Sequence, residues 1–85
     1  MDTDERTSTF TAGPGGVMTD EVGVITGEVT LRTVVDGGGT VHQTIQYTGA
    51  DEWYGVTGAP TTLAAGASID NVHSAAVEAM TRGQQ

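Results

Sequence analysis

The chain of 85 residues contains no cysteine and no lysine. Without cysteine it forms no disulfide and offers no thiolate as a nucleophile or metal ligand. Its three basic residues, Arg6, Arg32 and Arg82, lie far apart in the sequence and are outnumbered by 11 acidic residues. Because nucleic acids and anionic membranes are also negatively charged, a net charge of −8 predicts direct binding to neither.

Aromatic residues and long apolar runs are scarce as well. The chain has one tryptophan, two tyrosines and one phenylalanine, and no stretch has the length of a membrane-spanning helix. Residues 1–6 are acidic and are not followed by the apolar segment of a secretory signal peptide. We therefore expect a cytoplasmic protein.

A β-hairpin is the strongest signal in the sequence. Residues 28–35 and 40–47 are rich in β-branched side chains and alternate between apolar and polar positions. The segment 36–39 between them reads Asp-Gly-Gly-Gly. Two such runs around a glycine-rich turn predict a pair of antiparallel strands.

The register of this hairpin follows from the requirement that apolar side chains share one face. A three-residue loop at 37–39, closed by a glycine with positive φ, places Leu31 opposite Ile45 and Val35 opposite Val41. A four-residue loop would mix the two faces. In the favoured register the opposite face of the hairpin is expected to be exposed to solvent or to contact another chain. The residues on this face are Glu28, Thr30, Arg32, Val34, His42, Thr44 and Gln46.

The remaining segments predict fewer elements. Residues 1–16 are polar and end in a glycine-rich stretch, which indicates a flexible tail. The first strand is expected to run over 21–35 with a bend at Gly27. A third strand is predicted over 52–57, and a brief extended piece at Thr62 and Leu63.

One helix is predicted near the end of the chain. Ser68 suits the N-cap, Asp70 suits the positive helix end, and Gly83 is a natural stop. Glu78 and Arg82 form a favourable i, i+4 pair. The apolar stripe of this helix is formed by Ile69, Val72, Ala76, Ala79 and Met80.

The predicted fold is therefore α+β: a three-stranded antiparallel β-meander with one C-terminal α-helix packed on its apolar face, in the order β-β-β-α. The expected organisation is a tail over 1–16 and a single small domain over 17–85.

A two-layer domain of this size buries a small core. Because no disulfide is available, association with another chain is the common remaining way to stabilise it. We expect a homo-oligomer, such as a homodimer, or a subunit of a larger assembly.

Trp53 and Tyr54 are candidate contacts for such a partner. Neighbours on a strand point to opposite faces, so only one of the two rings can join the core. Exposed aromatic side chains beside a sheet are favoured as interface anchors. The predicted contact set is Trp53, Tyr54, Arg32, His42 and Gln46.

The sequence shows no catalytic or metal-binding motif. His42 and His73 are far apart and have no partner at metal-ligand spacing, and His73 is expected at the flank of the helix. No Gly-x-Ser-x-Gly motif surrounds a serine. No cofactor is predicted, and a non-enzymatic protein is favoured.

Three classes of function remain. The favoured one is a small interaction or accessory protein that acts as a homo-oligomer or bound to a larger protein partner. The second is an acidic inhibitor, immunity protein or nucleic-acid mimic, suggested by the net charge, although the acidic residues are dispersed along the chain. The third is a small-molecule binder or enzyme whose pocket is completed by dimerisation, with His42 as the first residue to test.

Overall fold

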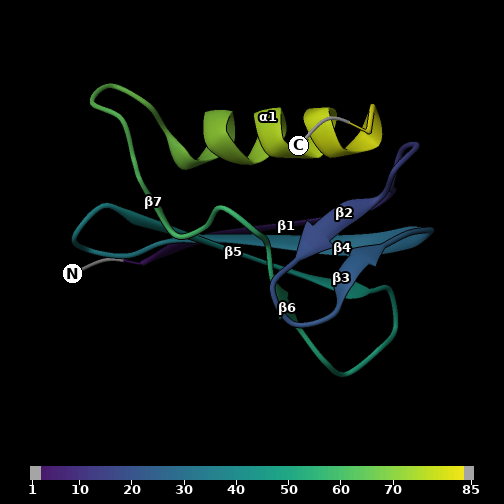
Figure 1. The fold of residues 1–85 in the computed structure, drawn as a ribbon. Helices are drawn as coiled ribbons and strands as arrows, with labels where there is room; N and C mark the ends of the chain where they lie inside the picture. The colour runs from purple at the N-terminus through teal and green to yellow at the C-terminus, as the bar shows by residue number, and fades with distance from the viewer. Residues whose placement is uncertain (1–2, 84–85) are drawn as a thin grey trace.

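Seven strands in two sheets and one helix make up the computed structural model, which describes residues 3–83 (Figure 1). In chain order the elements are β1 (Asp4–Thr11), β2 (Val17–Thr19), β3 (Gly23–Ile25), β4 (Glu28–Val35), β5 (Thr40–Tyr47), β6 (Tyr54–Gly55), β7 (Thr61–Thr62) and α1 (Ile69–Thr81). The main sheet has the order β1-β4-β5-β6, with β7 also paired to β5, and β2 and β3 form a separate sheet. The α+β class is thus confirmed.

The central hairpin has the predicted register. In the β4–β5 pair, Leu31 lies opposite Ile45 and Val35 lies opposite Val41. The carbonyl of Asp36 accepts a hydrogen bond from the N–H of Gly39 at 3.0 Å, and φ of this glycine is 84°. The requirement that apolar side chains share a face therefore identified both the loop length and the pairing.

The three-stranded meander is wrong, because the sheet has a further long strand. Residues 4–11, which the sequence placed in the flexible tail, form β1 and pair antiparallel with β4 along its whole length. This strand is polar, and only Ser8 and Phe10 are half-buried, so it lacks the apolar alternation that marks a strand. Its place in the sheet comes from the backbone groups of β4 that face away from β5 and need partners.

A single bent strand over 21–35 is also wrong. Gly27, with φ of 85°, separates β4 from β3, and β3 turns back to pair with β2 in a second hairpin. Val17 and Ile25, from the two strands of this hairpin, are 0% and 1% exposed and belong to the core. The segment thus forms a separate cover for the apolar face of the main sheet.

The third strand is shorter than predicted, whereas the helix matches. Regular pairing near residues 52–57 is limited to β6, and the extended piece at Thr61–Thr62 is present as β7. The Ser68 side chain accepts from the N–H of Asn71 at 3.2 Å, which confirms it as the N-cap. Past the last helical residue, Gly83 has φ of 84°.

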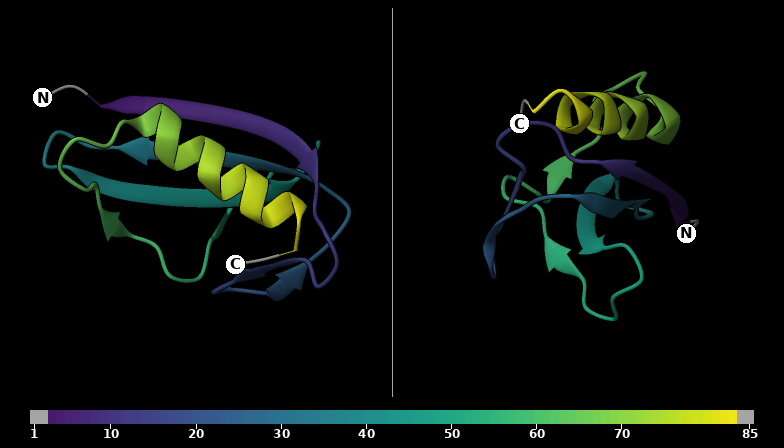
Figure 2. Two further views of the ribbon diagram at one scale, coloured as in Figure 1. Left: turned by 90° about the horizontal axis from the view of Figure 1, so that it is seen from above. Right: turned by 90° about the vertical axis from the view of Figure 1, so that its right-hand side faces the viewer.

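The core lies on one face of the main sheet. Helix α1 runs across this face, above β1 and β4, as seen from above in Figure 2, and the β2–β3 hairpin packs against the same core. At the helix end, the N–H of Gly13 donates to the carbonyl of Met80 at 2.9 Å, and a Cβ at Gly13 would overlap the backbone of Thr81 and Gly83. The core residues are Val17, Ile25, Val29, Leu31, Val35, Val41, Ile45, Val56, Ile69 and Met80.

No helix in the described range, residues 3–83, is long and apolar enough to cross a bilayer.

Candidate functional site

Three of the predicted contact residues lie together on the face of the sheet opposite the helix. Arg32 is on β4, and His42 and Gln46 are on β5, opposite Val34 and Thr30. Because directly opposed residues of antiparallel strands share a face, all three side chains belong to the polar face anticipated from the sequence.

Each of these side chains is also engaged within the chain. Arg32 makes two contacts with the Glu5 carboxylate of β1, through Nε at 2.9 Å and Nη2 at 3.2 Å. This partner lowers the pKa of Glu5 below its ordinary value. His42 Nε2 lies 3.2 Å from the Asp36 carboxylate, and Gln46 donates to a backbone carbonyl in the following turn. The polar face is therefore organised by local pairs.

The two aromatic candidates lie at the margin of the sheet, and neither is a buried core residue. Trp53 precedes β6 and is 39% exposed. Tyr54 is half-buried, lies opposite Ile45 and donates its hydroxyl hydrogen to Glu52 at 3.0 Å. The expectation that one ring joins the core is wrong, because β6 is a two-residue edge strand rather than a strand across the sheet.

The two edges of the main sheet differ sharply. On one side β6 and β7 each pair through two residues, so little backbone is left open. On the other side β1 is eight residues long and contains no proline, and its charged residues are confined to the first half, Asp4 to Arg6. Short strands, prolines and charged side chains are the usual means of blocking an edge. The edge of β1 is thus the longest strand edge without a neighbouring strand in the described part of the chain, and it is uncharged from Thr7 onward.

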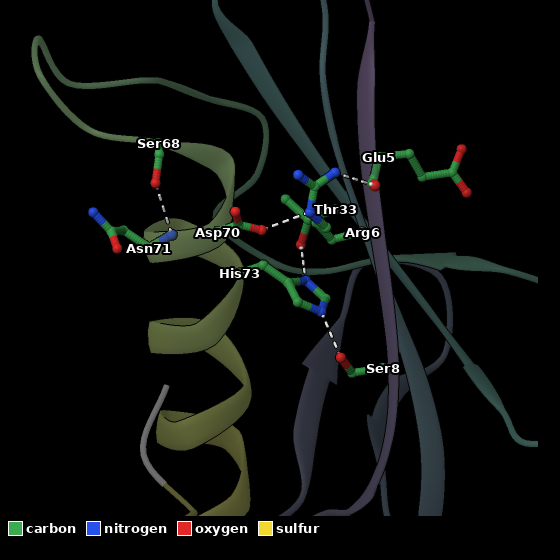
Figure 3. Close-up of polar contacts among 8 residues, drawn as sticks. All are labelled: Glu5, Arg6, Ser8, Thr33, Ser68, Asp70, Asn71 and His73. Atoms are coloured by element: carbon green, nitrogen blue, oxygen red, sulfur yellow. Dashed lines mark hydrogen bonds and ion pairs between the residues drawn. The ribbon is translucent and has the colours of Figure 1, made fainter.

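The hydrogen-bonding groups at this edge follow from the β1–β4 ladder. The N–H of Ala12 donates to the carbonyl of Gly27 at 2.9 Å, at the end of the pair. Antiparallel strands alternate between bonded and non-bonded pairs. The backbone N–H and C=O groups of Glu5, Thr7 and Thr9 therefore point away from β4. The Glu5 carbonyl accepts a hydrogen bond from Nη1 of Arg6 at 2.8 Å, so a strand added here replaces this side-chain donor (Figure 3).

A cleft of about 560 Å³ opens between β1 and α1 on the covered face. Ser8 forms its wall on β1, and the helix contributes Asn71, Ser74, Ala75 and Glu78 among others. Next to it, an ion pair spans the same two elements, because Arg6 Nε lies 2.6 Å from the Asp70 carboxylate (Figure 3). The cleft and the free edge of β1 lie side by side.

His73 joins the helix to the two strands beneath it. The imidazole is 6% exposed, with Nδ1 at 2.8 Å from Thr33 Oγ1 and Nε2 at 2.8 Å from Ser8 Oγ (Figure 3). Sequence reasoning missed this role, since His73 was expected at the helix flank. The signal was available, because His73 is four residues after Ile69 and seven before Met80, on the same helical face.

The hydrogen-bond pattern of this group fits either tautomer of the neutral imidazole. Thr33 Oγ1 also lies 3.4 Å from the amide nitrogen of Gln43, which donates to it. A hydroxyl donates one hydrogen and accepts up to two hydrogen bonds, so Thr33 and Ser8 can each donate to or accept from the ring nitrogen that they face. In each tautomer one ring nitrogen donates and the other accepts, and both are satisfied.

This arrangement holds the elements of the fold together. Both ring nitrogens of the buried imidazole lie within hydrogen-bond distance of hydroxyl groups, one on β1 and one on β4. Burial, together with the charge of Arg6, lowers the pKa of His73 and keeps the ring neutral, against a smaller opposing influence of Asp70. The group ties α1 to β1 and β4.

Metal ligation finds no support in residues 3–83, where no three His, Asp or Glu side chains are grouped to hold an ion. Several acidic residues serve local structure instead. Glu21 accepts from the N–H of Gly55 at 2.8 Å, and Asp20 accepts from the hydroxyl of Thr57 at 3.0 Å. Comparisons with protein family models, curated proteins and solved structures found no match.

Proposed function

We propose that this chain is a small non-enzymatic interaction protein that acts while bound to another protein chain, either a second copy or a larger partner. The observation that carries the proposal is the eight-residue edge strand β1, which has no neighbouring strand on its outer side and is uncharged from Thr7 onward. A row of unpaired N–H and C=O groups is a template for another strand, and proteins that do not use such an edge generally block it.

The surroundings of this edge support the same function. The polar face of β4 and β5, with Arg32, His42 and Gln46, continues directly from β1 and is left open by the helix. A chain bound at the edge would extend this face. Trp53 lies beyond β5, and we propose it as a secondary contact for a larger partner.

The other two classes of function gain less support. Both ring nitrogens of His73 face the hydroxyl groups of Ser8 and Thr33, so no carboxylate orients this ring as in a Ser-His-Asp triad. The three arginines pair with Glu5, Asp70 and Glu78, and the other acidic residues are dispersed along the sequence. An acidic inhibitor needs its carboxylates arranged to match a basic surface.

The native size of the protein in a lysate of the source cells tests this proposal. The chain is expected to elute from a sizing column in an assembly well above its own 8.7 kDa. Thr7→Pro removes an N–H that points out of the sheet, so it is expected to reduce the assembly while preserving the β1–β4 ladder. The matched variant Thr7→Ala keeps the N–H and is expected to behave as the unmodified chain. Elution of the unmodified protein as the free chain contradicts the proposal.

A further inference from the structure

We propose that the occupant of the free edge is a second copy of this chain, whose β1 pairs antiparallel with the first β1 about a two-fold axis through Thr7. This inference rests on the proposed function and specifies its partner and geometry. It joins the two main sheets into one continuous sheet.

The backbone of β1 is self-complementary in this arrangement. Its outward-pointing groups belong to Glu5, Thr7 and Thr9, which are spaced two residues apart. With the axis at Thr7, this residue meets its own copy, and Glu5 of each chain meets Thr9 of the other. Each of these is a bonded pair, because the N–H and C=O groups of both members face one another.

The side chains also favour this register. On the face that carries the helix, Arg6 of one copy lies opposite Ser8 of the other, and no charged residue stands directly opposite another. An axis through Arg6 would instead bring two guanidinium groups together, which is unfavourable.

The position of the helices agrees with this pairing. Helix α1 packs on β1 and β4, close to the proposed axis, so the two copies of α1 lie on the same face of the joined sheet, on either side of the axis. The flank of α1 at the cleft carries the small residues Ser74 and Ala75, which allow close approach. The two clefts then face each other and become covered by the opposite copy.

The charge of the chain sets the salt dependence of this dimer. Each copy carries a net charge of −8, so two copies repel one another at low ionic strength. Dissolved salt screens this repulsion over a distance of about 10 Å at 0.1 M. The dimer is therefore expected to tighten as salt is added over the range below physiological ionic strength.

The cysteine-free sequence allows the register to be tested by single-cysteine variants. Bonded antiparallel pairs have Cα atoms about 5.5 Å apart, within the range of about 4.4–6.8 Å that a disulfide spans. Thr7→Cys is therefore expected to form a disulfide-linked dimer under mild oxidation. In Thr9→Cys the two cysteines are separated by four residues along the strands, about 13 Å, so this matched control is expected to stay unlinked. Mixing Glu5→Cys with Thr9→Cys is expected to give the linked heterodimer.

The outcomes separate this inference from the proposed function. If the native protein elutes as an assembly but none of Thr7→Cys, Ser8→Cys and Thr9→Cys links to itself, the interaction function stands and pairing through β1 is wrong. Linking of Ser8→Cys or Thr9→Cys to itself in place of Thr7→Cys overturns the register. Sedimentation of the unmodified chain gives an independent measurement, and a monomer up to millimolar concentration overturns the dimer whatever the variants do.

Discussion

The hydrogen-bonded group around His73 gives the most specific prediction for the stability of this fold. Thr33→Val keeps the shape of a fully buried side chain but removes the hydroxyl that faces Nδ1 of His73. His73→Leu removes the ring and leaves the Thr33 hydroxyl without its imidazole partner. Each single variant thus leaves one polar atom unpaired in the core, whereas the double variant removes both atoms.

The magnitude follows from the cost of an unpaired buried group. Each single variant is expected to lower the free energy of unfolding by about 1–3 kcal/mol. The double variant is expected to lose about 1–2 kcal/mol less than the sum of the two, because replacing both partners by apolar groups removes the unpaired atom. A domain of 85 residues has a total stability of roughly 4–13 kcal/mol, so these changes are large enough to measure.

Urea unfolding followed by far-UV circular dichroism measures all four members of this cycle. Ser8→Ala is the matched control, since Ser8 is only half-buried and water can replace its hydroxyl; it is expected to cost less than about 1 kcal/mol. Additivity of Thr33→Val and His73→Leu within about 0.5 kcal/mol would refute the assigned hydrogen-bond group.

Three further predictions concern the core, the helix end and pH. Leu31→Ala, at a fully buried position, is expected to cost about 2–5 kcal/mol in urea unfolding, whereas Val24→Ala, at a side chain 47% exposed, is expected to cost less than about 1 kcal/mol. Gly13→Ala places a methyl group against the helix backbone and is expected to lower the melting temperature, while Gly38→Ala, whose nearest atom is at 3.5 Å, is expected to leave it nearly unchanged. Because burial lowers the pKa of His73 in the folded state, the unfolded chain takes up the proton first. The contribution of His73 to the free energy of unfolding is therefore fully present above about pH 6.5 and is expected to be lost as the pH is lowered through the folded-state pKa. His73→Leu is expected to remove this part of the pH dependence of stability.

Sequence reasoning succeeded where a segment carries its own signal. The β4–β5 register follows from the requirement that apolar side chains lie on one face of the hairpin. The start of the helix follows from Ser68, whose side chain can accept a hydrogen bond from a backbone N–H of the first turn. It failed for β1, whose threonine-rich sequence resembles a polar tail. Sequence reasoning also failed for His73. A single histidine within an apolar stripe does not indicate which hydroxyl groups on other strands it will contact.

The candidate site divides in the same way. The polar face with Arg32, His42 and Gln46 was visible in the period-two pattern of the hairpin. The edge of β1 and its cleft with α1 were not, because they depend on where the N-terminal strand docks. Contacts between β1 and α1 join residues about 65 positions apart, such as Ser8 and His73, and nothing local to either residue predicts them.

By itself, then, the sequence determined the α+β class, the central hairpin with its loop and register, and the limits of the helix. These depend on turn chemistry, capping and side-chain alternation, which act over a few residues. Tertiary structure alone decided that the N-terminal segment forms the edge strand, that the β2–β3 hairpin covers the core, and that His73 meets hydroxyl groups from two strands. Those outcomes arise because unsatisfied backbone and apolar groups of one segment must find partners in segments that are distant along the chain.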